Sequence, residues 1–323
     1  MNRNNNTSNI TESAMVTGIL IITALISSIV PIARFFYPTP AVILAKRRGI
    51  KYAALSLFAA DMIIIMLLGI STGISYLILF TPFALALAYG VYRDEEANKT
   101  ILYGSAAYMI SFVAFILLLD ALMGVNFVEQ MRTGFSEAYK YTEEMLYSLP
   151  GGVNGESIEQ ALQMIRETKA ASEFILTNLF PAIIIMSSVM VSYVNYLIAR
   201  KFSSRFSIII RKHEGLSHFS FPRTFMIAMA ALLLISLMLG VLKFNVRVIQ
   251  LNLFYIIFLA MALQGFAVIK FLIEKRIDNK SFRTIMTFMM FYMAFFVLGI
   301  VQIIALIGLV DLAINLRKLN RVV

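Results

Sequence analysis

One acidic residue lies in the middle of a long apolar stretch of this sequence. Asp61 follows two alanines and precedes a methionine and three isoleucines, with no basic residue close to it along the chain. A carboxylate at the centre of a bilayer costs about 3 kcal/mol, so it should face a partner or a polar cavity, or be protonated. Asp61 is therefore a candidate ligand-binding residue; the alternative is a neutral acid that donates one hydrogen bond between helices.

Three polar residues share one face of a later apolar stretch. Ser188, Ser192 and Asn195 are spaced at i, i+4 and i+7, which places them on one side of a helix. Pro181 should bend or open that helix towards its outer end. Polar residues at this spacing also serve as hydrogen bonds between packed membrane helices. With a smaller polar pair on the preceding stretch, the predicted ligand-binding residues are Asp61, Tyr108, Ser111, Ser188, Ser192 and Asn195.

The sequence lacks the usual signatures of an enzyme. His213 and His218 bracket a near miss of the H-E-x-x-H zinc motif, but five-residue spacing would separate the two rings by about 140° around a helix. The chain has no cysteine and no phosphate-binding loop. Only one carboxylate lies deep in an apolar stretch, which leaves no acid and base pair. We therefore predict no metal, no cofactor and no catalytic activity.

The elements that position these residues are nine apolar stretches. Eight have roughly the 20 residues that a spanning helix needs, whereas the second contains Pro38 and Pro40 and would cover only about half of a ~30 Å hydrocarbon core. Its backbone must be buried in protein or line a wet cavity. The sequence predicts an all-α polytopic membrane helix bundle with eight spanning helices and one short proline-broken segment. The stretches are 13–33, 35–45, 50–70, 73–92, 100–123, 176–199, 224–242, 248–270 and 284–310.

Composition supports a membrane protein and argues against nucleic-acid binding. Hydrophobic residues make up 60% of the 323 residues and charged residues 14%, with a mean hydropathy of +0.82. One globular core could not hide that much apolar surface from water. The net charge of +10 lies in residues that flank apolar stretches, as expected for contact with anionic lipid headgroups. We predict a multi-pass protein of a bacterial cytoplasmic membrane.

Basic residues gather in four connections, which the positive-inside rule assigns to the cytoplasm. The N-terminus is then cytoplasmic if the short second segment returns the chain across the membrane. Arg317, Lys318 and Arg321 would fall outside, against the same rule, unless the last stretch is itself broken near Gly299 or Gly308. The four connections lie at residues 46–51, 93–99, 200–223 and 270–283.

The long external segment 124–175 contains eight glutamates and four basic residues. Asn126 followed by Glu129 has the spacing of a capping box, and apolar residues then recur at helical spacing. We expect a helical hairpin in this segment. It either caps the outer mouth of the bundle or lies among the lipid headgroups.

Several short motifs carry a resemblance to known proteins. They are Phe-Phe-Tyr-Pro-Thr-Pro-Ala at 35–41, Lys-Arg-Arg-Gly at 46–49, Gly-Leu-Val-Asp at 308–311 and Leu-Arg-Lys at 316–318. Together with the first apolar stretch, they make the whole chain resemble the YybS-like family of bacterial integral membrane proteins.

Residues 13–199 are in turn similar to the substrate-binding S components of energy-coupling-factor vitamin transporters. This resemblance implies a six-segment domain at 1–199, including the hairpin 124–175, and a three-segment extension at 200–323. It also implies that Ala14 and Gly18, at small-residue spacing on the first stretch, would face a coupling protein. A ligand would sit near the outer ends of helices four to six.

These observations lead to one predicted function and one alternative. We predict a membrane-embedded component that binds and translocates a small solute and works with a separate coupling protein and ATPase. The broken half-helix, Asp61 and the polar face of residues 188–195 together resemble a site at the bilayer midplane. The alternative is a noncatalytic scaffold or assembly partner that uses the outer hairpin or the basic 200–223 loop as its contact surface.

Overall fold

The computed structural model describes residues 3–124, 126–148, 155–213, 215–297 and 299–319. Within these ranges the regular structure is helical, and seven helices are long and apolar enough to cross a membrane. The predicted all-α membrane bundle is therefore confirmed. The chain divides into two compact units, one formed by Met1–Leu176 and Ile183–His213 and the other by Thr177–Ala182 and Glu214–Val323.

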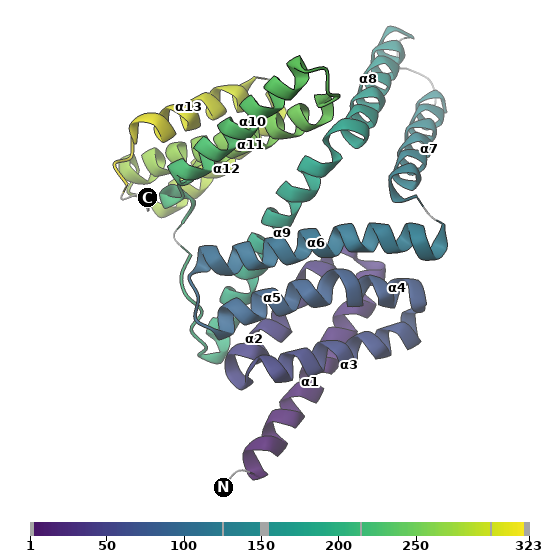
Figure 1. The fold of residues 1–323 in the computed structure, drawn as a ribbon, viewed down its shortest axis with the longest axis vertical. Coiled ribbons are helices and arrows are strands. Elements are labelled where there is room, and N and C mark those ends of the chain that lie inside the picture. The colour runs from purple at the N-terminus through teal and green to yellow at the C-terminus, as the bar shows by residue number, and fades with distance from the viewer. Residues whose placement is uncertain (1–2, 125, 149–154, 214, 298, 320–323) are drawn as a thin grey trace. The chain divides into compact units, whose positions relative to one another are not determined.

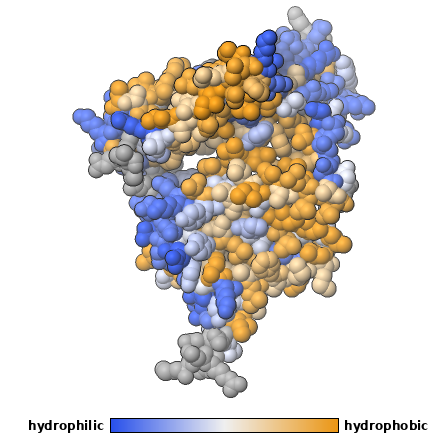
Figure 2. All heavy atoms as spheres, viewed as in Figure 1, coloured by the Kyte–Doolittle hydropathy of each residue, from blue (hydrophilic) through white to orange (hydrophobic). Residues whose placement is uncertain are grey.

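The first unit contains the N-terminal helices and the helical hairpin predicted in segment 124–175 (Figure 1). Apolar side chains cover much of the surface in Figure 2, whereas hydrophilic residues gather over the two helices of the hairpin. In chain order its elements are α1 (Arg3–Ile29), η1 (Pro31–Phe36), α2 (Pro38–Arg48), α3 (Ile50–Leu68), α4 (Ile70–Ser75), η2 (Tyr76–Phe80), α5 (Thr81–Tyr92), α6 (Ala97–Met123), α7 (Phe127–Tyr147), α8 (Gly155–Phe174), the start of η3 (Ile175–Leu179), most of α9 (Phe180–Ser203) and η4 (Ser204–Phe206). Thr177–Ala182, at the junction of η3 and α9, belong to the second unit. As predicted, the Asn126 side chain caps α7 by accepting a hydrogen bond from the Glu129 amide at 3.0 Å.

The short proline-broken segment returns the chain across the bundle. The 3-10 turn η1 and helix α2 together extend about 28 Å at ~2.0 and ~1.5 Å per residue, so the turn supplies length that the apolar stretch alone lacks. Arg48 at the end of α2 donates two hydrogen bonds to Glu12 on α1, at 2.8 and 2.6 Å. The beginning of α1 therefore lies beside the basic connection between α2 and α3, so both lie on one side of the bundle, the side that the positive-inside rule assigns to the cytoplasm.

Two helices widen into five-residue π-helical segments, and each segment ends two residues before a proline. The segment η2 precedes Thr81-Pro82, and η3 precedes Phe180-Pro181. Proline lacks the amide hydrogen that would bond to the preceding turn, so the helix opens there. The predicted distortion at Pro181 is confirmed.

A side chain from another helix, Asn252, satisfies the backbone groups that lose their hydrogen bond where the helix opens at Pro181. The Asn252 amide donates to the Asn178 carbonyl at 2.6 Å and accepts from the Ala182 amide at 2.8 Å. These two backbone groups would pair with each other in an unbroken helix. Asn252 thus replaces a backbone hydrogen bond within the second unit, as apolar surroundings require.

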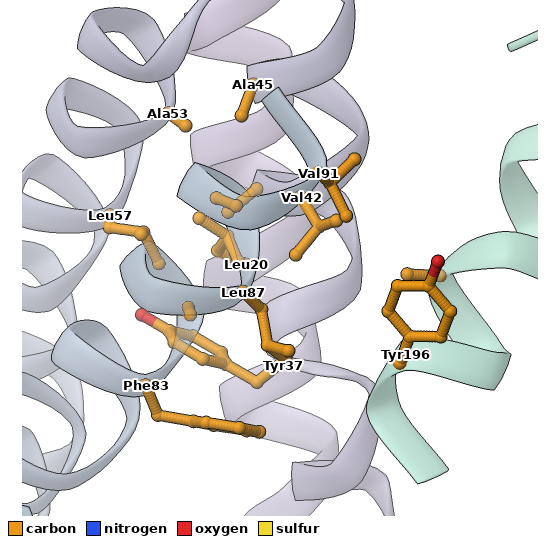
Figure 3. Packing of buried hydrophobic residues seen from close by; sticks show 14 of the residues in the cluster. Leu20, Tyr37, Val42, Ala45, Ala53, Leu57, Phe83, Leu87, Val91 and Tyr196 are labelled. Atoms are coloured by element: carbon orange, nitrogen blue, oxygen red, sulfur yellow. The ribbon is translucent and has the colours of Figure 1, made fainter. Parts of the chain in front are cut away.

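The core of the first unit lies where α2 and α5 meet α1, α3 and α6. Alanines at the contact positions let the backbones approach closely, and Leu57, Phe83 and Leu87 fill the remaining space. Figure 3 shows the ring of Tyr37 beside Leu87 and Phe83. This packing fixes the start of α2 in the interior of the bundle.

The second unit contains four longer helices and one short turn, η5 (Leu216–His218), α10 (Arg223–Val241), α11 (Arg247–Arg276), α12 (Lys280–Phe296) and α13 (Ile300–Ile314). The predicted stretch 284–310 is therefore two helices, because Gly299 adopts a φ of 90°. At 1.5 Å per residue, α12 and α13 extend about 25 and 22 Å, less than a full hydrocarbon core. Of the two break positions considered, the structure has the one at Gly299.

The break returns residues 315–319 to the side of the basic loop that precedes α10. Arg317 donates a hydrogen bond to the Ser217 carbonyl at 2.7 Å. Ser217 belongs to the 200–223 connection, which its charge assigns to the cytoplasm. The conflict between the C-terminal basic residues and the positive-inside rule disappears for Arg317 and Lys318, while Arg321 lies outside the described residues.

The absence of native cysteines makes this topology directly testable. Lys318→Cys should resist a membrane-impermeant maleimide in intact cells and react after permeabilisation, because Lys318 is exposed and lies on the side that the positive-inside rule assigns to the cytoplasm. Ser204→Cys is the matched cytoplasmic control and Lys140→Cys the external one. Labelling of Lys318→Cys in intact cells at the rate of Lys140→Cys would contradict the return at Gly299.

Candidate functional site

Asp61 lies inside the first unit and accepts hydrogen bonds from two different elements. The Tyr37 hydroxyl donates to Oδ1 at 2.8 Å, and the Thr81 hydroxyl donates to Oδ2 at 2.6 Å. All three residues are at most 1% exposed. Asp61 thus joins α3 to the start of α2 and the start of α5, and its carboxylate does not face lipid.

A second polar contact extends this arrangement to α1. The hydroxyl of Tyr76, in the π-helical segment η2, forms a hydrogen bond with the hydroxyl of Ser27. The rings of Tyr37 and Tyr76 meet edge to face, with centroids 4.7 Å apart. We call Ser27, Tyr37, Asp61, Tyr76 and Thr81 the Asp61 cluster. Its members lie on α1, at the start of α2, on α3, on η2 and at the start of α5, so the cluster is sensitive to movement of any of these elements.

Both residues that donate to Asp61 directly precede a proline. Tyr37 is the residue before Pro38 at the start of α2, and Thr81 is the residue before Pro82 at the end of η2. The prolines interrupt the regular backbone at these points and fix where the new helix begins. Irregular backbone of this kind is tolerated at membrane depth where protein surrounds it.

The chemistry open to the Asp61 cluster follows from its unused hydrogen-bonding capacity. A carboxylate oxygen can accept two hydrogen bonds, and each oxygen of Asp61 accepts one side-chain donor. The Tyr37 and Thr81 hydroxyls can also accept hydrogen bonds. The cluster therefore has acceptor capacity left for a cation or for further N–H or O–H donors.

The predicted polar face of α9 lies against α6 and makes no hydrogen bond to Asp61 within the described residues. Ser192 donates to the Ile101 carbonyl of α6 at 2.7 Å. Ser188 and Asn195 donate to carbonyl groups one turn earlier on their own helix, at 2.6 and 2.9 Å. The Asn195 Oδ1 atom is buried and has no hydrogen-bond partner in the described part of the chain.

The other predicted residues also lie apart from the Asp61 cluster. Tyr108 packs its ring against Phe83 at a centroid distance of 5.2 Å, and Ser111 is buried one turn further along α6. On α1, Ala14 is exposed, and a Cβ atom added at Gly18 would meet no atom within 4 Å. The α1 surface at these two small residues is therefore open within this chain.

The second unit holds a buried ion pair that the sequence analysis did not identify. Arg317 donates from its side chain to Asp311 Oδ2 at 2.9 Å, and Gln264 of α11 donates to the same oxygen at 2.7 Å. The side chains of Arg317 and Asp311 are at most 1% exposed. Gln264 also accepts from the Phe221 amide at 3.1 Å. This cluster connects α11, α13, the C-terminal turn and the loop before α10.

Close packing of α11 and α13 supports this ion pair. A Cβ atom at Gly265 would overlap the carbonyl oxygen of Ile304, and one at Gly308 would overlap the carbonyl oxygen of Met261. Only glycine permits such an approach of two backbones. Across the described residues, no group of three or more His, Asp or Glu side chains is arranged to hold a metal ion.

Comparison with known proteins agrees with this architecture. The chain is 23% identical over 230 residues to the "Uncharacterized protein YybS" of Bacillus subtilis (strain 168), which covers 70% of this chain and 71% of that protein. No solved structure matches the chain. Residues 14–312 match the family model described as "Predicted membrane protein (DUF2232)". Because this match covers most of the sequence and both units, the chain belongs to that family of membrane proteins.

Proposed function

We propose that this protein binds a small solute at the Asp61 cluster and passes it across the membrane with the help of separate subunits. The observation that carries the proposal is the fully buried carboxylate of Asp61, which accepts hydrogen bonds from hydroxyl groups at the starts of two helices, α2 and α5, each next to a proline. Ionisable residues within membrane segments most often mark substrate or ion pathways. Helices interrupted near the midplane commonly supply the binding groups.

The hydrogen bonds of the Asp61 cluster suggest how binding would couple to movement. We infer that the occupant takes the place of the Tyr37 hydroxyl at Asp61 Oδ1; the ring of Tyr37 also contacts Tyr76. Release of Tyr37 frees the start of α2 from α3, because the Tyr37 hydroxyl joins the two helices through its hydrogen bond to Asp61. We therefore propose that α2 moves when the solute binds, and that the hydrogen bond of Tyr37 holds α2 in place until then.

The proposed partners are a coupling protein and an ATPase. The small residues Ala14 and Gly18 lie on a part of α1 that is open within this chain. Small faces let another helix approach closely in a membrane. Copurification of an ATPase with the native protein, and its loss in Gly18→Leu, would support this part of the proposal.

Native mass spectrometry of the purified protein tests the binding site. We expect a retained small molecule whose affinity falls at least about tenfold in Asp61→Asn and Thr81→Val, because a hydrogen bond to a charged group contributes about 1.5–3 kcal/mol. Thr81→Ser keeps the hydroxyl and should restore binding. Ser105→Ala is the matched control, since Ser105 is a buried hydroxyl that donates only to its own helix.

Three results would contradict solute binding at this site. The first is the absence of any retained molecule from protein purified after growth in several media. The second is equal loss of the molecule in Ser105→Ala and Asp61→Asn. The third is unchanged occupancy in Asp61→Asn and Thr81→Val with an unchanged unfolding midpoint.

The outer hairpin favours the second candidate function, an assembly partner. Helix α7 exposes three large side chains within two turns, Tyr141 at 71%, Met145 at 60% and Tyr147 at 66%. An exposed apolar group of this kind often marks a protein or membrane contact. Crosslinking from α7 that recovers one stoichiometric protein and no ATPase would favour this function over solute transport.

A further inference from the structure

A basic groove lies at the cytoplasmic end of α9, away from the Asp61 cluster. It has a volume of about 600 Å³. One side is formed by Leu197, Arg200, Lys201 and Ser204, and the other by residues 207–210. Both sides belong to the first unit.

The groove forms because the chain turns back on itself after α9 (Figure 1). Ser207 adopts a left-handed conformation with a φ of 56°, and the Ile208 amide bonds back to the Ser203 carbonyl at 3.1 Å. The returning segment is then fastened to α9, since the Tyr196 hydroxyl donates to the Arg211 carbonyl at 2.7 Å. The ring of His213 also packs on Tyr193 at 5.1 Å. The two walls are therefore held in place by fixed contacts.

The groove and the segment that returns along it carry charges of one sign. Residues 197–213 include five basic residues and no acidic one: Arg200, Lys201, Arg205, Arg211 and Lys212. In the described part of the chain, none of the five forms an ion pair. Asp94 lies near Arg211, but it is paired with Lys46. The hydrogen bond from Lys46, with the charges of Lys46 and Arg211, keeps the pKa of the Asp94 carboxyl below its usual value.

Apolar side chains extend outward from the same turn. Ile209 is 85% exposed and Phe206 is 58% exposed. Arg205 lies over the ring of Phe202 at 5.5 Å, so its charge is held close to this apolar group. A surface that combines unpaired cations with exposed aliphatic and aromatic groups matches the boundary between headgroups and acyl chains.

We propose that this groove binds an anionic phospholipid of the cytoplasmic leaflet, with the headgroup phosphate at Arg200 and Lys201 and an acyl chain along Ile209. Arginine and lysine both bind phosphate oxygens with charge-assisted hydrogen bonds. The Ser207 hydroxyl lines the groove and can donate to the same headgroup, whereas the Ser204 hydroxyl donates to the Lys201 carbonyl at 2.8 Å. The position of the groove at the end of a spanning helix puts it at the depth where such lipids lie.

Lipid titration followed by native mass spectrometry tests this site. Protein stripped of lipid in an uncharged detergent is titrated with phosphatidylglycerol, phosphatidylcholine and inorganic phosphate. We expect phosphatidylglycerol to bind in preference to phosphatidylcholine. A basic residue near an anionic lipid surface contributes about a fivefold factor, so Arg200→Gln with Lys201→Gln should weaken binding about 25-fold.

Matched variants distinguish a specific lipid-binding site from a general effect of positive charge. Lys51→Gln with Arg93→Gln removes two exposed cytoplasmic charges elsewhere and should leave the affinity within about twofold. Ile209→Ser keeps every charge and should still weaken phosphatidylglycerol binding. This variant tests the site even if the Arg200→Gln, Lys201→Gln double variant does not fold. Equal loss in both double variants, equal retention of phosphatidylcholine, or binding of free phosphate at the same strength as the lipid would overturn the proposal.

Discussion

Arg317→Met should lower the free energy of unfolding by about 3–5 kcal/mol, the largest effect we expect from a single side chain. The substitution leaves Asp311 buried without its cationic partner, and an uncompensated buried charge is strongly destabilising. It also removes the hydrogen bond to the Ser217 carbonyl, which holds the C-terminal turn against the loop before α10. Unfolding of the purified protein in mixed micelles, followed by far-UV circular dichroism, measures the change.

Two control variants identify the cause of that loss. Asp311→Leu combined with Arg317→Met removes both charges and should recover most of the stability, since a buried pair can often be replaced by apolar residues at little cost. Lys270→Gln breaks a partly exposed pair with Glu274 at 3.9 Å and should change stability by less than about 1 kcal/mol. If the double variant is as unstable as Arg317→Met, the loss does not come from an unpaired carboxylate.

The sequence predicted the helices well because lipid imposes a simple pattern. An apolar run of about 20 residues has few options other than a spanning helix, so seven of the nine predicted stretches match helices long enough to cross a membrane. The last predicted stretch is harder to interpret, because a glycine inside an apolar run is compatible with a helix as well as with a break. Its break depends on Gly299 adopting a positive φ, which the apolar pattern does not reveal.

The partners of Asp61 were less predictable than Asp61 itself. A single carboxylate in an apolar run is visible in the sequence, whereas Tyr37 and Thr81 are ordinary residues that become significant only when α2 and α5 pack on α3. One signal could have identified them. Both precede prolines inside apolar stretches, and a proline disfavours the regular helical conformation of the residue before it.

The prediction of a single ligand site assumed that polar residues on different stretches converge. Instead, Ser192 bonds to a backbone carbonyl of α6, which is the packing role that such residues commonly have in membranes. The pairing of Asp311 with Arg317 was missed for a related reason. Residues at i and i+6 do not share a helix face, and they meet only because α13 ends at Asn315 in a left-handed conformation.

Gly265→Ala should destabilise the second unit by about 1–3 kcal/mol, although it adds only one methyl group. The new Cβ atom would overlap the carbonyl oxygen of Ile304, so α11 and α13 would have to separate. Separation would also pull Gln264, the neighbour of Gly265, away from Asp311. We therefore expect Gly265→Ala and Gln264→Leu to lose less stability together than the sum of their separate losses, which a double-mutant cycle in micelles can measure.

Gly134→Ala provides the matched control, because the same substitution occurs inside a helix with open space around it. No atom lies within 4 Å of a Cβ atom at Gly134, and the residue is exposed on α7. Alanine costs less backbone entropy than glycine in a helix, so this variant should gain about 0.5–1 kcal/mol. Opposite signs for the two Gly→Ala variants would show that close backbone contact, and not helix propensity, requires glycine at position 265. A neutral or stabilising Gly265→Ala would mean that α11 and α13 do not approach each other as described.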